Sequence, residues 1–161
     1  MGKVRRSVLL LVSKAYERLT GKCLVVKAET WWGRPMLVTL PEPASTQIFL
    51  EGRMDPILTD FLCHALKPGQ VFVDVGAHLG YFSLLAGHLV GLNGCVLAFE
   101  PAPETFALLK RNVAFVNAIQ AYPLALWSEE ARLSFHTYGQ RFSAYNSFFA
   151  PRVAPAYLHR L

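Results

Sequence analysis

The chain has 161 residues, of which 53% are hydrophobic and 17% charged, and its formal net charge is +5. This length is enough for one domain with a packed core, and so apolar a composition excludes a disordered chain. The cysteines stand far apart and form no C-x-x-C pair, which excludes a disulfide framework and a zinc cluster: Cys23, Cys63 and Cys95. We therefore expect no bound metal, and reduced thiols in a reducing, cytoplasmic compartment.

The positive charge is concentrated at the two ends of the chain. Seven Lys or Arg residues and a single acid, Glu17, lie within residues 1–27, and four arginines follow Glu130 with no further Asp or Glu. We interpret this charge as an ordinary solvated surface, and the alternative is attraction to an anionic surface or substrate. No basic run alternates with aromatic residues, so nucleic acid is not an expected partner.

A helix is predicted over residues 1–20. Its apolar run at 8–12 is too short for a signal peptide, and far shorter than the roughly 20 residues of a membrane span. Six apolar residues fall on one helical face: Val4, Val8, Leu11, Val12, Ala15 and Leu19. We expect this face to pack on the domain or on a partner, and the alternative is weak contact with a membrane surface.

A small β element and a second helix are predicted next. The strands are expected at 23–29, 36–40 and 46–50, with a turn at Trp31-Trp32. Asp55-Pro56 has the residue types of a helix start. The apolar face of that helix is expected to consist of Ile57, Leu58, Phe61, Leu62 and Ala65.

The centre of the chain has the pattern of a strand, a glycine loop and a helix. An apolar run at 71–75 contains Asp74, glycines follow at positions 76 and 80, and a helix is predicted over 81–90. Glycine lets the backbone approach a ligand closely, and the start of a helix presents unpaired N–H groups. Asp74 stands at the carboxyl end of the strand, where open α/β sheets bind ligands.

A second strand is predicted over 95–99, and it ends at Glu100 and Pro101. An acid at this position is well placed to accept hydrogen bonds from ribose hydroxyls. The preceding loop reads D-x-G-x-x-x-G, without the G-x-G-x-x-G spacing of a dinucleotide site or a Walker lysine. The two strand ends therefore indicate a nucleoside cofactor without phosphates, for which S-adenosylmethionine is the common candidate.

The last predicted elements are a helix that begins at Pro103 and a strand over 119–126. Pro123 interrupts this strand, which places it at the edge of the sheet. A short alternating strand is predicted over 131–137, and irregular structure follows Tyr138.

Two blocks of sequence resemble the FkbM family of class I methyltransferases. They are F-V-D-V-G-A-H-L-G-Y-F-S at 72–83 and A-F-E-P-x-P-x-x-F-x-x-L-x-x-N at 98–112, and Asn146-Ser147 resembles a further short element of that family. The resemblance covers about residues 55–147, and the family usually has asparagine where this chain has His78. It implies a Rossmann-like α/β fold with strand order 3-2-1-4-5-7-6, S-adenosylmethionine as cofactor, and O-methylation of a small-molecule or sugar hydroxyl.

The candidate cofactor residues lie at the two strand ends. We predict that Glu100, next to Pro101, binds the ribose hydroxyls. The methionine part of the cofactor is expected to contact Asp74, Gly76, Ala77, His78 and Gly80. No catalytic base is assigned. Two alternatives remain: a non-catalytic remnant that binds the cofactor or a partner chain, and a nicotinamide-binding module, which the loop spacing disfavours.

The chain is divided into an N-terminal helix with short strands (1–54), the cofactor-binding half of a methyltransferase domain (55–147) and an irregular basic tail (148–161). No fourth strand with an acidic end is predicted after Ser147, so the sheet is expected to be truncated after its third strand. We favour a fragment or truncated gene product; the alternatives are pairing with another chain and a C-terminal hairpin that fills the gap. Because an unpaired apolar strand invites association, self-association is expected.

Overall fold

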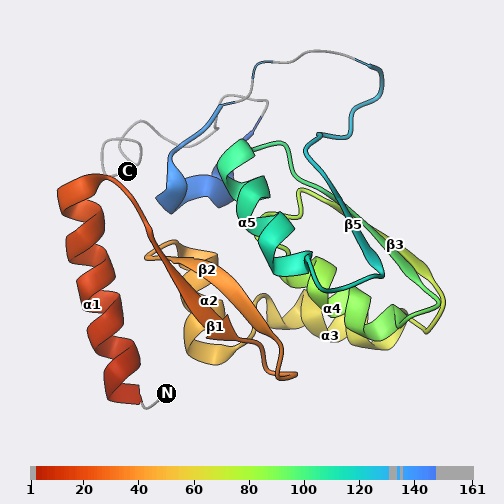
Figure 1. Cartoon of the computed structure of the whole chain (residues 1–161), viewed down its shortest axis with the longest axis horizontal. Helices are drawn as coiled ribbons and strands as arrows, with labels where there is room; N and C mark the ends of the chain where they lie inside the picture. Colours follow the sequence, from red (N-terminus) through yellow and green to blue (C-terminus); the bar gives the residue numbers. More distant parts are fainter. Residues whose placement is uncertain (1–2, 131–133, 135, 148–161) are drawn as a thin grey trace.

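The structure, a computed structural model, describes residues 3–130, 134 and 136–147. A long helix, α1 (Lys3–Thr20), leads into an antiparallel hairpin of β1 (Leu24–Glu29) and β2 (Pro35–Leu40). Figure 1 shows these elements on one side of the molecule and the second sheet on the other. The first predicted helix and the first two predicted strands are confirmed. The strand predicted over 131–137 lies largely outside the described residues, and the tail at 148–161 lies wholly outside them.

Three parallel strands form the second sheet, in the order β3 (Val71–Val75), β4 (Cys95–Phe99) and β5 (Ile119–Tyr122). Helix α4 (Tyr81–Val90) connects β3 to β4, and α5 (Pro103–Val113) connects β4 to β5. Strand β5 lies at an edge and ends one residue before Pro123, because proline has no N–H group with which to continue the ladder. The predicted α/β class and the edge position of this strand are confirmed.

The strand predicted over 46–50 is wrong, because these residues belong to helix α2 (Pro43–Glu51). The buried Glu42 side chain begins this helix by accepting hydrogen bonds from the backbone N–H groups of Ala44 and Ser45, at 3.0 and 2.6 Å. Pro43 occupies the first helical position, which needs no N–H donor. Glutamate is an uncommon N-cap, so no clear signal for a helix start was present in the sequence. The apolar pattern of residues 46–50 therefore favoured a strand. The next helix, α3 (Pro56–Ala65), begins at its Asp55 cap as expected.

The N-terminal hairpin and the parallel sheet share one core, and the buried Asn112 side chain of α5 joins them. Its Oδ1 accepts a hydrogen bond from the N–H of Leu37 at 2.7 Å. Its Nδ2 donates to the carbonyl of Leu37 at 2.9 Å and to that of Leu79 at 2.8 Å. Asn112 therefore holds strand β2 against the loop that follows β3.

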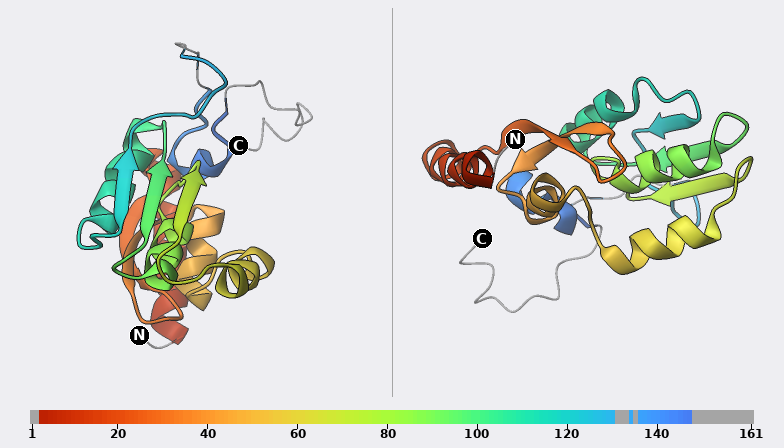
Figure 2. Two further views of the ribbon diagram at one scale, coloured as in Figure 1. Left: turned by 90° about the vertical axis from the view of Figure 1, so that its right-hand side faces the viewer. Right: turned by 90° about the horizontal axis from the view of Figure 1, so that it is seen from below.

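One face of the parallel sheet is covered and the other is open. Helices α4 and α5 lie on the covered face, where Val96 and Ala98 of β4 are fully buried. On the opposite face three valines of β3 are exposed, Val71 by 64%, Val73 by 46% and Val75 by 61%. The left panel of Figure 2 shows the strands from this side, with no helix in front of them. We call these three valines the open sheet face; parallel sheets are normally covered on both sides.

We expect the open sheet face to make the chain self-associate. Replacing Val73 with aspartate places a charge in the middle of this face, and should weaken association by about tenfold, equivalent to about 1.4 kcal/mol. Size-exclusion chromatography with light scattering, at several protein concentrations, measures the change in self-association. Leu92→Asp is the matched control, because Leu92 is 91% exposed in a turn away from this face. A monomeric wild-type chain with cooperative unfolding would contradict the prediction.

Most residues of the predicted apolar faces of two helices are exposed. In α1 the predicted face is exposed, with Leu19 at 86% and Val4 at 77%, and the helix packs on the domain through other residues. In α3 one member of the predicted face, Leu62, is buried beside Thr59, whereas Ile57 is 84% and Phe61 63% exposed. The helix is therefore confirmed and packs on the domain, but not through its predicted apolar face; packing of that face on a partner stays a prediction.

Candidate functional site

The loop after β3 is held against the end of β4 by its own backbone. The N–H groups of Gly76 and Ala77 both donate to the carbonyl of Phe99, each at 2.9 Å. Gly76 has φ +77°, His78 has φ +51° and Gly80 has φ +89°, so the loop passes through three left-handed conformations before α4 begins. This geometry brings the ends of the two strands together.

The carboxylate of Glu100 links the two strand ends. This side chain is only 6% exposed, and each of its oxygens accepts one backbone hydrogen bond. Oε2 accepts from the N–H of His78 and Oε1 from the N–H of Ala102, both at 2.9 Å. A carboxylate oxygen can accept more than one hydrogen bond, so Glu100 keeps capacity for hydroxyl donors of a ligand.

A cavity of about 320 Å³ lies at these strand ends. Four of the predicted cofactor residues line it: Gly76, His78, Glu100 and Pro101. The rest of the lining consists of Val75, residues 125–127, Ser143, Ala144, Asn146 and Ser147. Its volume lies near the lower end of the roughly 300–1,000 Å³ of small-molecule sites. The structure thus joins both predicted strand ends in one hollow.

The other three predicted residues do not line this cavity. Asp74 accepts a hydrogen bond from the hydroxyl of Ser83 in α4 at 2.5 Å; burial raises the pKa of its carboxyl group, and the hydrogen bonds from Ser83 oppose this rise. Ala77 is 6% exposed. Gly80 begins α4 at φ +89°, and a Cβ atom there would lie 2.6 Å from Cδ1 of Leu109. These three residues stabilise the conformation of the loop and do not line the cavity.

The imidazole of His78 forms part of the cavity wall. Its Nε2 lies 2.7 Å from Oγ of Ser143. Burial lowers the pKa of His78, and the opposing effect of the Glu42 and Glu100 carboxylates is smaller. This lowered pKa favours the neutral form of the ring.

The lowered pKa of His78 predicts a pH-dependent stability. In the unfolded chain His78 binds a proton as the pH falls below 6.5, the ordinary pKa of histidine. In the folded chain His78 stays unprotonated until the pH reaches its lower pKa, so protonation favours the unfolded chain in this range. We expect the free energy of unfolding to rise with pH up to about 6.5 and this contribution to end there. In His78→Asn the rise should be smaller, because asparagine tolerates a positive φ but does not titrate. Urea unfolding at several pH values compares the two, and identical slopes would contradict the prediction.

Sequence reasoning missed Ser143 because it expected irregular structure after Tyr138. This serine lies in a short 3₁₀ helix, η1 (Gln140–Tyr145), which packs near the strand ends. No local pattern marks η1, since its position depends on contacts with distant residues. Asn146, in contrast, was noted through the family resemblance; it lines the cavity, and its Oδ1 accepts from the N–H of Tyr138 at 3.0 Å.

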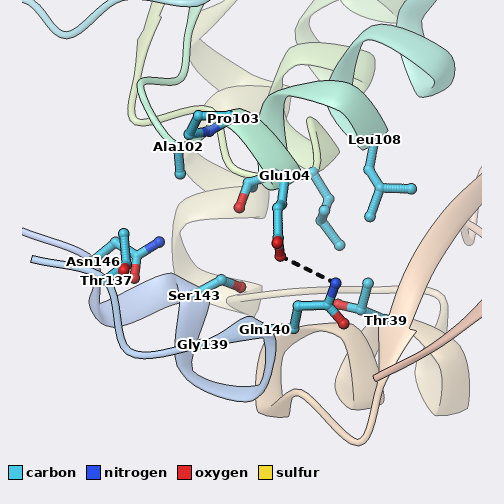
Figure 3. Close-up of a pocket in the computed structure, with 12 residues that line it drawn as sticks. Thr39, Ala102, Pro103, Glu104, Leu108, Thr137, Gly139, Gln140, Ser143 and Asn146 are labelled. Carbon is cyan, nitrogen blue, oxygen red and sulfur yellow. Dashed lines mark hydrogen bonds between the residues drawn. The ribbon is translucent and has the colours of Figure 1, made fainter. Parts of the chain in front are cut away.

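Figure 3 shows the residues that line a second cavity, of about 370 Å³. It lies between η1 and the start of α5, and the two cavities share Ser143 and Asn146 as lining residues. Gln140 donates a hydrogen bond to Glu104 across it at 3.1 Å, the dashed line in Figure 3. None of the predicted cofactor residues lines this second cavity.

The sequence is similar to that of methyltransferases. It is 50% identical over 60 residues to the 31-O-demethyl-FK506 methyltransferase FkbM of Streptomyces tacrolimicus, over 35% of this chain and 23% of that protein. It is 37% identical over 83 residues to Methyltransferase 1 of Beauveria bassiana, over 48% of this chain and 33% of that protein. No family model matches. The resemblance to FkbM-type methyltransferases is confirmed, and the matches span a third or less of these relatives.

A solved structure with a partly similar fold is that of P. horikoshii TYW2 in complex with MeSAdo. The similarity has a TM-score of 0.48 at 17% identity, and it covers 78% of this chain and 51% of that one.

Proposed function

Because the chain carries part of a methyltransferase domain, we propose that it binds S-adenosylmethionine in the strand-end cavity and serves methyl transfer to a hydroxyl group. One observation carries the proposal: Gly76, His78, Glu100 and Pro101, predicted from two separate strand ends, line a single hollow. The relative from Streptomyces tacrolimicus is named for an O-demethylated small molecule, which supports a small-molecule hydroxyl as the acceptor class.

The residues present fit this cofactor. Glu100 has acceptor capacity for ribose hydroxyls beyond its two backbone hydrogen bonds. A Cβ atom at Gly76 would meet nothing within 4 Å, so the backbone is open to a ligand on that side. Leu126 and Trp127 also line the cavity and offer apolar surface to an adenine ring.

When bound, S-adenosylmethionine would supply an electrophilic methyl group for an acceptor hydroxyl, with S-adenosylhomocysteine as the leaving group and the hydroxyl proton passing to solvent. The part of the protein is to hold and align the reactants, and such alignment is a major source of rate. Glu100 fixes the orientation of the loop through the N–H of His78. His78 contributes a neutral ring, oriented by Ser143.

Calorimetric titration of the purified chain with S-adenosylhomocysteine and with NAD tests the proposal. We expect binding of the first and none of the second, because the loop lacks the glycine spacing that a pyrophosphate needs. Glu104→Gln serves as a control, since Glu104 lines only the second cavity. Binding of NAD alone, or of neither compound, would overturn the assignment.

Cofactor binding without catalysis is the second candidate, and the open sheet face favours it. Exposed valines on a parallel strand indicate that further structure covers this side in an assembled methyltransferase. A chain that binds S-adenosylhomocysteine but transfers no radiolabelled methyl group to small-molecule hydroxyl acceptors would support this reading.

A further inference from the structure

Helix α1 has two faces of different character. Its inner face holds the fully buried Ser13 and the partly buried Leu9 and Leu10, and Arg6 on this side donates to the carbonyl of Leu50 at 2.6 Å. Its outer face carries the apolar residues of highest exposure: Val4 at 77%, Val8 at 54%, Leu11 at 67%, Val12 at 51% and Leu19 at 86%. Figure 1 and the right panel of Figure 2 show α1 at the outer margin of the molecule.

The outer apolar residues form a continuous stripe. At about 100° per residue they and Ala15 occupy an arc roughly 100° wide, on the side of the helix opposite Ser13. A stripe of this width on a helix normally faces a core. In α1 it faces solvent throughout its length, so its apolar surface has no partner within the described part of the chain.

The charges around this stripe are all positive. Arg5 lies at one border, and Lys14 and Arg18 lie at the other; all three are exposed. The helix contains one acid, Glu17, and it lies toward the inner side, where it pairs with Arg141 at 3.3 Å. The outer surface of α1 therefore combines apolar side chains with cationic ones and has no exposed acid of its own.

We propose that α1 lies flat on an anionic membrane surface, with its outer stripe inserted among the lipids and its basic borders against the headgroups. Basic amphipathic helices bind such surfaces through the sum of apolar burial and charge attraction. Pairing with α1 of a second copy is disfavoured, because it would bring Arg5, Lys14 and Arg18 of both copies together without a balancing acid. No helix in the described ranges is long and apolar enough to cross a membrane.

Co-sedimentation of the full chain with lipid vesicles tests this proposal. We expect binding to phosphatidylcholine vesicles that contain phosphatidylserine to be about tenfold tighter or more than to phosphatidylcholine alone, and to weaken as salt is raised. The double variant Val8→Glu/Leu11→Glu should lose binding to both vesicles. The triple variant Arg5→Gln/Lys14→Gln/Arg18→Gln should lose the preference for phosphatidylserine.

Leu92→Glu is the matched control for the apolar double variant. Leu92 is 91% exposed in the turn after α4, and Figure 1 shows α4 on the opposite side of the molecule from α1, so this charge should leave vesicle binding unchanged. Circular dichroism and S-adenosylhomocysteine titration report whether each variant is folded.

Three results would overturn the proposal. The first is a wild-type chain that stays in solution with phosphatidylserine vesicles, and the second is equal loss of binding in Leu92→Glu and in the double variant. The third is a double variant that lowers the molecular mass in light scattering without vesicles, because this would make the stripe an interface between copies.

Discussion

Replacing Glu100 with alanine should weaken S-adenosylhomocysteine binding at least about tenfold, equivalent to about 1.4 kcal/mol for lost charged hydrogen bonds. The same change should lower the free energy of unfolding by about 3 kcal/mol, because the backbone N–H groups of His78 and Ala102 lose their buried acceptor. Both effects have one origin: this carboxylate joins the two strand ends and faces the cavity between them.

Calorimetry and urea unfolding separate the two effects. Glu100→Gln keeps one acceptor oxygen and should be more stable than Glu100→Ala, yet it should still bind weakly because the charge is absent. Glu104→Ala is the matched control, a carboxylate on the exposed first turn of α5 that should change neither quantity by much. Unchanged affinity in a folded Glu100→Gln variant would show that Glu100 does not hold the cofactor.

Replacing Gly80 with alanine should destabilise the protein by about 3 kcal/mol, from a left-handed backbone and an overpacked core together. The glycine has φ +89°, and the new Cβ would lie 2.6 Å from Cδ1 of Leu109, a side chain with no solvent exposure. Neither the backbone nor the core can relax freely there, so the chain should unfold at a markedly lower urea concentration.

Gly76→Ala provides the comparison, because this glycine has a similar φ of +77° but open space around it. It should lose only about 1 kcal/mol of stability. Because Gly76 lines the cavity, the added methyl group should also weaken ligand binding. The double variant Gly80→Ala/Leu109→Val should recover part of the stability lost in Gly80→Ala, which a double-mutant cycle measures. Equal losses at positions 76 and 80 would show that contact with Leu109 is not the cause.

The two strand ends were predictable because each strand is a short apolar run with a glycine or an acid immediately after it. Such runs form buried parallel strands, and the residues that follow them must lie at the same edge of the sheet. Helix α2 was not predictable by the same means. Its start depends on Glu42, and glutamate is rarely the N-cap of a helix. The side chain of Glu42 is also fully buried, which depends on the tertiary structure.

Helical periodicity predicted α1 and α3 correctly, yet most residues of their predicted apolar faces are exposed. Periodicity describes how side chains are arranged around one helix, and it contains no information about what lies beside that helix. In α1 a polar residue, Ser13, is the fully buried one, whereas Leu19 is 86% exposed.

From the amino-acid order alone came the elements of the parallel sheet, the likeness to methyltransferases and the idea that Gly76, His78 and Glu100 serve one ligand. Each of these inferences depends only on short runs of neighbouring residues, which can be recognised in the sequence without the folded structure. Only the folded chain separates the residues that line the cavity from those behind it, such as Gly80, and brings Ser143 to within 2.7 Å of His78 across 65 positions of sequence. The reason is that a cavity wall is built by packing between distant segments, and no short stretch of sequence specifies such packing.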